Sequence, residues 1–417
     1  MDSLNRTSSS KNFYLLLIGQ VISLFGNSIQ RYSMSLFILD ITGSASTFSV
    51  IIAISIIPTI LLSPIGGAIA DRFNRKHLMV GLDLISTLLT GSFAIALLLG
   101  HSSITIIGVL MVLLSILAAI EQPATQACIP IIVEDGSLEK ANGLVSQVSS
   151  ISNLFGPILA GTLYGVCGLN TVIFINCASF FFAAIIEMFL YIPYVSKKIQ
   201  KNLVVTLFGD MKDSLQYVIH KKAFIMQLIL MFAALNLFVE PVYSIGVPYI
   251  IKKVLNAGNQ LYGVTESVIC FGGLLGALLI GITAKKFSVT NLYKVFYLSG
   301  ASFILMSASI FTPFLKGAAP LLAYCLFTLL AFFSMYTIST INIISVTFLQ
   351  KQISNEIMGK VMALVTAICM CCMPIGQVFY GVLIELFAHN TYIITTLAAT
   401  FTLIVALVIK RILKDKF

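Results

Sequence analysis

Apolar runs, separated by short polar breaks, follow one another along almost the whole chain. A helix needs about 20 apolar residues to cross the hydrocarbon layer of a membrane. The pattern therefore predicts an all-α polytopic membrane protein with twelve transmembrane helices. The expected spans are residues 13–39, 47–70, 77–99, 104–129, 142–165, 170–193, 223–250, 262–284, 291–312, 318–348, 358–386 and 391–411.

The composition excludes an ordinary soluble protein. Of the 417 residues, 58% are hydrophobic and only 10% are charged, whereas a soluble domain carries roughly 25% charged residues to wet its surface. The eight cysteines lie in apolar segments, where we expect them to act as small hydrophobic residues. No disulfide framework, metal site or cofactor is expected.

The distribution of the basic residues predicts the orientation in the plasma membrane. With both termini placed in the cytoplasm, 21 lysines and arginines fall on the inner side, and only Lys252, Lys253 and Lys316 fall outside. The remaining one, Arg31, lies within a span. This asymmetry agrees with the excess of Lys and Arg in cytoplasmic loops of membrane proteins. It also makes a nucleic-acid partner unnecessary to explain the net charge of +9.

The longest polar break divides the chain near its middle. We expect a six-helix bundle at 1–193, a cytoplasmic linker at 194–222 and a second, pseudo-symmetric six-helix bundle at 223–417. The linker carries apolar residues at helical spacing, which predicts an amphipathic helix on the inner membrane face; they are Leu207, Phe208, Met211, Leu215 and Val218. Two six-span halves joined by a basic linker are typical of a duplicated transporter.

The loop after the second expected span has a distinctive order of small and charged residues. Gly66-Gly67-Ala68-Ile69-Ala70-Asp71-Arg72-Phe73-Asn74-Arg75-Lys76 closely resembles the G-x-L-A-D-R-x-G-R-K motif of the major facilitator superfamily, and a weaker copy begins at Gly281. The resemblance implies two bundles that rock about a central site, with Gly67, Asp71, Arg72, Arg75 and Lys76 acting as a conformational-switch loop. Taken alone, the segment would also suit a solvated basic loop.

Other phrases resemble the branch of this superfamily that contains macrolide efflux proteins and the enterobactin exporter. They are Thr42-Gly43-Ser44-Ala45, Gln122-Pro123-Ala124-Thr125-Gln126 and Ala141-Asn142. The resemblance implies secondary active transport by alternating access. It favours proton-coupled efflux of a drug, a macrolide or a siderophore-like molecule over import by the same fold.

The fifth expected span contains Gly156, Pro157 and Gly161, which predict a bend, because proline removes a backbone hydrogen bond. The phrase is similar to the G-x-x-x-G-P-x-x-G-G motif of antiporters, although Ser152 and Ala160 replace two glycines. This similarity favours export. A packing kink without any bearing on direction is the alternative.

Charged residues within spans are candidates for function, because an isolated charge at a helix centre costs about 2.5–3.5 kcal/mol. They are Arg31, Asp83, Glu121, Glu187, Glu240 and Glu266. The resemblance places Arg31, Glu121 and Glu240 on cavity-lining helices. Arg31 and Glu240 both lie ~25 Å from the inner face at 1.5 Å per residue, which predicts an ion pair.

Glu121 falls in the inner part of the membrane, too far from Arg31 to share its charge. A buried carboxylate without a cation holds a proton more readily than one in water, so Glu121 is the first candidate for proton coupling and Glu240 the second. The arginine that many proton-coupled relatives carry in the fourth span is missing here. Asp83 and Glu266 lie close to span ends, where a structural hydrogen bond or an interfacial position is expected, and Glu187 allows either interpretation.

Further polar side chains are candidates for the cavity wall: Asn27, Gln30, Gln126, Asn236, Tyr336 and Asn342. Few fixed charges and many apolar residues suit a small lipophilic substrate, with a cation among the possibilities. The four histidines form no ligand cluster and no Walker A motif occurs, so neither a membrane enzyme nor an ATPase is expected. A channel, a receptor and a scramblase are weaker alternatives to a monomeric transporter.

Overall fold

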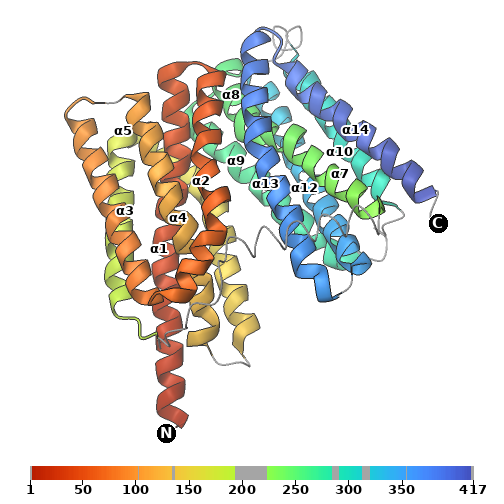
Figure 1. Ribbon diagram of the computed structural model, residues 1–417. Coiled ribbons are helices and arrows are strands. Elements are labelled where there is room, and N and C mark those ends of the chain that lie inside the picture. Colours follow the sequence, from red (N-terminus) through yellow and green to blue (C-terminus); the bar gives the residue numbers. More distant parts are fainter. Residues whose placement is uncertain are drawn as a thin grey trace. The chain divides into compact units, whose positions relative to one another are not determined.

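The computed structural model describes residues 2–101, 103–133, 137–192, 223–283, 291–311, 320–353 and 355–414, and all regular elements within these ranges are helices (Figure 1). In the N-terminal part they are α1 (Asp2–Thr42), α2 (Ala45–Arg72), α3 (Arg75–Leu98), α4 (Ile104–Ile132) and α5 (Leu138–Met188). In the C-terminal part they are α7 (Ala223–Phe238), α8 (Val247–Tyr249), α9 (Asn259–Thr283), α10 (Leu292–Ser309), α12 (Pro320–Gln352), α13 (Asn355–Leu386) and α14 (Tyr392–Lys414). Two π-helical stretches, η2 (Val242–Gly246) and η3 (Ile250–Val254), flank α8.

Ten helices in the described part of the chain are long and apolar enough to cross a membrane. This finding confirms the all-helical, multi-span class that the apolar runs predict. The expected amphipathic helix at 194–222 lies outside the described residues. The expected fifth and sixth spans share the label α5, whose 51 residues comprise two helices that meet at the non-helical residue Gly168.

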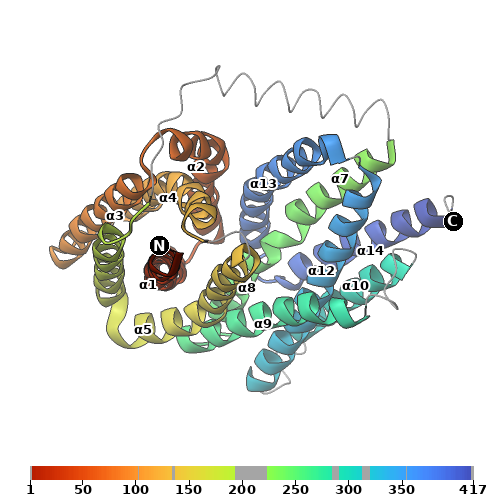
Figure 2. The same ribbon diagram turned by 90° about the horizontal axis from the view of Figure 1, so that it is seen from below.

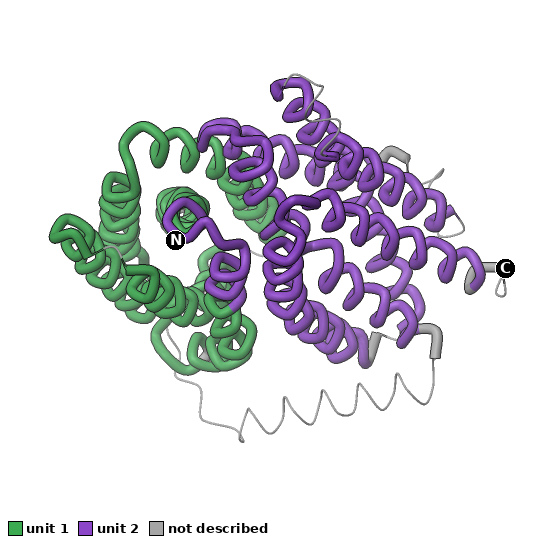
Figure 3. The backbone as a smooth tube through the Cα atoms, turned by 90° about the horizontal axis from the view of Figure 1, so that it is seen from above, with its two compact units in different colours: residues 1–38, 54–204 green, residues 39–53, 205–417 purple. Residues whose placement is uncertain are grey.

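The chain divides into two compact units, coloured separately in Figure 3. Unit 1 comprises residues 1–38 and 54–204, and unit 2 comprises residues 39–53 and 205–417. The C-terminal end of α1 and the start of α2 therefore belong to unit 2. Between them, Gly43 adopts a φ of 60° and its N–H bonds to the carbonyl of Leu39 at 3.0 Å. Glycine adopts this left-handed conformation without steric penalty and so ends the helix cleanly.

In unit 1, α1 is enclosed by its neighbours. Seen end-on, α1 lies among α2, α3, α4 and α5 (Figure 2). At one end of the unit an apolar cluster joins Leu16 of α1, Met79 of α3 and Ile129 of α4, all almost fully buried. Without water as a competing partner, helices in lipid are held by close packing and hydrogen bonds between helices, and both are present here.

The closest approach of α2 and α4 depends on Gly66. A methyl group at this position would overlap the carbonyl oxygen of Ala119 in α4. The neighbouring Gly67 has no atom within 4 Å of the place that a Cβ would take. The close packing expected from the small residues at the end of the second span is therefore found at Gly66.

In unit 2, α9 packs on α12, α10 packs on α12 and α14, and α13 packs on α7. Gly272 and Gly276 of α9 lie one turn apart, and a methyl group at either would overlap a carbonyl oxygen of α12, that of Phe332 or Tyr336. This small-xxx-small spacing is typical of close helix pairs in membranes. Phe296 and Val361 lie fully buried in the apolar core of the unit.

The seventh expected span differs from a regular helix. After α7 the chain continues to Val254 through two π-helical stretches. Pro241 and Pro248 lie in this segment, and each lacks the N–H that an α-helical hydrogen bond would need. The extra residue in each π turn re-aims the side chains that follow, and such turns recur at functional sites.

We predict that Gly66→Ala lowers the stability of the protein, because the added methyl meets backbone atoms of α4 that cannot rotate away. Overpacking of this kind costs about 1–3 kcal/mol. Thermal unfolding of the purified protein in detergent, followed with a thiol-reactive dye, measures the effect. Gly67→Ala is the matched control and should leave the midpoint unchanged; an equal fall in both variants would contradict the packing role of Gly66.

Candidate functional site

A cavity of about 480 Å³ lies in unit 1, and helices α1 to α5 all contribute to its wall. Its polar lining consists of Asn27, Ser28, Gln30, Arg31, Ser55, Thr59, Ser86, Ser115, Glu121, Gln122, Ser149 and Asn153. Its apolar lining consists of Leu24, Met34, Ile56, Met111, Leu114, Ala118 and Phe180. Apolar walls with a few placed polar groups are typical of small-molecule sites.

The α1 side of the cavity carries amides and one cation. Asn27, Gln30, Arg31 and Met34 recur at helical spacing and so share one face of α1. The Gln30 side chain donates to the sulfur of Met34 at 3.3 Å and accepts from the Asn176 amide of α5. The Arg31 guanidinium lies 5.0 Å from the ring centre of Tyr32, a cation–π geometry that holds the charge at the wall.

The α4 side carries the acid. Met111, Leu114, Ser115, Ala118, Glu121 and Gln122 recur along one face of α4 and line the cavity. The Ser115 hydroxyl lies 2.6 Å from that of Thr59 and ties this face to α2. Arg31 and Glu121 thus border the same cavity, but no ion pair joins them among the described residues.

Beneath the cavity, α1 and α5 touch through the predicted helix-5 motif. Gly156 faces Ser28, whose hydroxyl donates to the Ser152 carbonyl at 3.2 Å. One turn further, the Ser33 hydroxyl donates to the Ala160 carbonyl at 3.4 Å. Gly156, Pro157 and Gly161 are buried and keep helical dihedrals, while the non-helical residue of α5 is Gly168. At this motif the structure therefore shows close packing against α1.

Two acids that sequence reasoning set aside lie deep inside unit 1. Asp83 of α3 is fully buried, and neither of its carboxylate oxygens has a hydrogen-bond partner among the described residues. Glu187 of α5 is 2% exposed and has one oxygen without a partner. Asp83 interacts electrostatically with both Glu121 and Glu187. The expectation of a hydrogen-bonded or interfacial Asp83 is wrong, because its face of α3 turns toward the other helices of the unit.

The loop between α2 and α3 is held by caps. Asn74 accepts a hydrogen bond from the His77 N–H at 3.4 Å and so caps the start of α3. Arg75 donates from Nε to the Ala70 carbonyl at 3.1 Å, at the C-terminal end of α2. Arg72 is exposed and Lys76 is half-buried. The side chain of Asp71 lies outside the described residues, so its part in the switch loop stays a prediction.

Unit 2 places the second acid candidate in a small polar network. Glu240 accepts a hydrogen bond from Ser244 at 3.3 Å, and Ser244 accepts one from Gln377 of α13 at 3.2 Å. Asn236, one turn earlier, donates to the Phe232 carbonyl at 3.0 Å. The pairing of Glu240 with Arg31 stays a prediction, because the two residues lie in different units.

The other cavity candidates lie elsewhere. Gln126 is exposed and does not line the unit 1 cavity. Tyr336 and Asn342 lie on α12 in unit 2, half-buried and exposed respectively. Neither Asn153 nor Asn176 stands out in the sequence, since single polar residues within apolar spans more often hold helices together than line a site.

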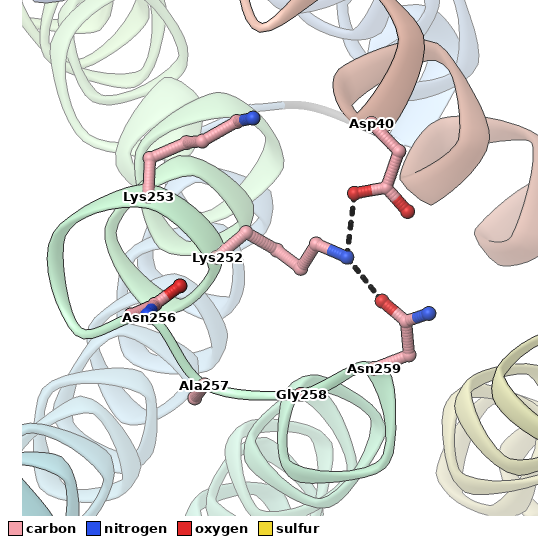
Figure 4. A pocket seen from close by; sticks show the side chains of 7 residues that line it. All are labelled: Asp40, Lys252, Lys253, Asn256, Ala257, Gly258 and Asn259. Atoms are coloured by element: carbon pink, nitrogen blue, oxygen red, sulfur yellow. Dashed lines mark hydrogen bonds and ion pairs between the residues drawn. The ribbon is translucent and has the colours of Figure 1, made fainter.

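A second polar site in unit 2 surrounds Lys252 (Figure 4). The Lys252 ammonium lies between two oxygen acceptors, the carboxylate of Asp40 at 2.6 Å and the side-chain oxygen of Asn259. Asn256 adopts a φ of 50° just before α9, a left-handed conformation that asparagine tolerates. The resulting turn returns the chain so that Asn259 faces Lys252.

The same surface of unit 2 holds residues 39–53 at further points. The Ser44 hydroxyl donates to the Glu385 carboxylate at 3.3 Å. Ser49 packs against Gly381 of α13, and a methyl group added to Gly381 would overlap the Ser49 side chain. An ion pair, a hydroxyl–carboxylate bond and a close helix contact together fasten this segment to α13 and to the turn before α9.

Comparison with known proteins identifies the fold and its relatives. The model of the Major Facilitator Superfamily matches residues 16–376. Macrolide efflux protein A of Streptococcus pyogenes is 24% identical over 396 residues, which cover 95% of this chain and 94% of that protein. The staphyloferrin A transporter of Staphylococcus aureus is 23% identical and covers 82% of this chain and 81% of its own.

Solved structures agree in fold. A bacterial homologue of the iron transporter ferroportin, in an inward-facing state, superposes with a TM-score of 0.71 at 16% identity, covering 96% of this chain and 98% of its own. The nucleoside transporter NupG, as its D323A mutant, superposes with a TM-score of 0.72 at 13% identity and covers 96% and 99%. At these identities the likeness concerns the fold alone.

We predict that Lys252→Ala loosens residues 39–53, because it removes the cation that binds Asp40. Side-chain exposures of 11% and 33% limit such a pair to about 1 kcal/mol or less, so amide hydrogen exchange of 39–53 should rise up to about fivefold. The matched control is Lys253→Ala, which removes the neighbouring charge and should leave exchange unchanged. Equal acceleration in both variants would show that general charge, and not the Asp40 pair, holds the segment.

Proposed function

Because the chain belongs to the major facilitator superfamily, we propose that it is a secondary active transporter that exports a small lipophilic molecule of the macrolide class in exchange for protons. The observation that carries this proposal is the unit 1 cavity, which combines an apolar wall with one cation and one acid. Its lining by Leu24, Met111 and Phe180 favours apolar substrate groups, and its amides and hydroxyls suit the oxygens of a macrolide. The relatives named for macrolide efflux support this substrate class.

Proton coupling is assigned to Glu121. Among the described residues it is the only acid that lines the unit 1 cavity, and no ion pair there joins it to Arg31. A carboxylate in a restricted, partly apolar site can exchange a proton with water in the cavity and so respond to a pH gradient. Glu240 is the second candidate, since its neighbours Ser244 and Gln377 are neutral.

We also infer the membrane arrangement. With α5 counted as two spans across Gly168, and α10 added to the ten apolar helices, twelve spans result. They would form six-helix segments at 1–193 and 223–417, with the linker at 194–222 and both termini in the cytoplasm of a plasma-membrane monomer. The basic loop around Arg72 and Arg75 supports this orientation, because such loops stay on the cytoplasmic side.

The test is transport by purified protein in liposomes, with radiolabelled erythromycin as the probe and an imposed pH gradient as the driving force. We expect saturable flux that stops when the gradient is dissipated. In intact cells the protein should lower erythromycin accumulation; higher accumulation would indicate import instead. If the protein transported staphyloferrin A but not erythromycin, the proposed macrolide class would be wrong and a siderophore would be the substrate.

We predict that Glu121→Gln abolishes flux driven by the pH gradient while erythromycin binding is retained, because the amide keeps the shape of the side chain but carries no exchangeable charge. Glu139→Gln is the control: Glu139 is exposed at the start of α5 and should keep full flux. Wild-type pH dependence in Glu121→Gln would remove this acid from the mechanism.

A further inference from the structure

We propose that Asp83, Glu121 and Glu187 act as one proton-binding cluster, in which Glu121 exchanges protons with the cavity and the two buried acids hold them behind its wall. This cluster deepens the proposed function and rests on it for its role in transport. Each acid comes from a different helix of unit 1, α3, α4 and α5. Neither Asp83 nor Glu187 lines the cavity.

The three carboxyl groups form a connected set. Asp83 interacts electrostatically with Glu121 and Glu187, and Glu187 interacts with Glu121. Glu121 borders the cavity. Ser86, which follows Asp83 by nearly one turn of α3, also lines it. The buried acids therefore adjoin the cavity through Glu121 and through the turn of α3 that carries Ser86.

No ion pair joins either buried acid to a cation in the described part of the chain. Both oxygens of Asp83 and one oxygen of Glu187 accept no hydrogen bond in the described part of the chain. Gly19 of α1 lies beside Glu187: a Cβ added to this glycine would be 3.9 Å from a carboxyl oxygen of Glu187. The thiol of Cys128 also interacts with Glu187. The nearby cations are Arg75, which interacts with Cys128 and caps α2, and Arg31 on the cavity wall.

A buried hydroxyl on the same face of α4 as Glu121 also has no partner among the described residues. Thr125 follows Glu121 by one turn and shares its face of α4. It is 5% exposed, and its oxygen has no partner among the described residues. A protonated carboxylic acid supplies one O–H donor, and a hydroxyl or a neighbouring carboxylate can accept it. A proton on Asp83 or Glu187 would remove the charge from a carboxylate that has an oxygen without a donor among the described residues.

A proton suits this cluster better than a metal ion. The described residues bring no three metal-ligating side chains into the geometry of a metal site. An ionised carboxylate buried without a donor is so costly that such groups are held neutral instead. In the proposed step a carboxylic acid of the pair, Asp83 or Glu187, passes its proton to the Glu121 carboxylate, which leaves a carboxylate behind and an acid at the wall.

The experiment is infrared spectroscopy of the detergent-solubilised protein during a titration from acidic to alkaline buffer. Protonated carboxylic acids have their own carbonyl stretch, which is distinct from that of carboxylates. We expect the wild-type protein to retain this band at neutral pH. Asp83→Asn and Glu187→Gln should each lower the intensity of this band by the contribution of one carboxylic acid. The control Glu139→Gln removes an exposed carboxylate and should leave the band unchanged.

Absence of the band in the wild-type protein at neutral pH overturns the proposal, whether or not the variants fold. Retention of the full band in folded Asp83→Asn and Glu187→Gln overturns it as well. The assay needs no substrate, so its failure is distinct from that of the proposed function. Erythromycin flux without the band would exclude only the cluster, and the band without flux of any probe would exclude only the transporter.

Discussion

Hydrocarbon offers no hydrogen bonds, and this constraint shapes every part of the structure. Each backbone N–H and carbonyl in a span must find its partner within the helix, which leaves side chains to join one helix to another. The hydroxyls of Ser28 and Ser33 therefore donate to carbonyls of α5 across the helix boundary. Gly66 allows α2 to reach α4 at van der Waals distance. Packing and hydroxyl–carbonyl bonds take the place that hydrophobic burial has in a soluble core.

The same constraint explains why the helices were predictable and their contacts were not. Apolar length alone predicts α4 from residue 104 and α3 over 77–99, and the structure has Ile104–Ile132 and Arg75–Leu98. A helix that is apolar all round, however, gives no periodic signal for the face that meets a neighbour. The motif contains two adjacent glycines, of which only Gly66 makes the close contact, and Asp83 looked interfacial by its depth although its face is buried.

The departures from regular helix have local causes that a hydropathy pattern does not report. Pro241 and Pro248 remove backbone donors, and π-helical stretches begin just after each of them, at Val242 and at Ile250. At Gly168 a φ of 77° separates the two helical parts of α5 without a long loop, so the two expected spans follow each other directly. The prolines and the glycine are visible in the sequence. Whether the backbone at such a residue forms a π turn, a kink or a continuous helix depends on the residues that pack around it.

In the proposed mechanism, charge in unit 1 links substrate and proton. Three acids lie at the cavity wall and behind it, and among the described residues Arg31 is the one cation that lines the cavity, so full ionisation of the acids would leave a net negative charge in an apolar setting. Protons can remove that charge, and so can a lipophilic cation bound against Glu121. Ligands that neutralise the same charge oppose each other's binding, and by linkage each weakens the other equally. Exchange of substrate for protons then requires no contact between them, only a cavity that opens to each side in turn.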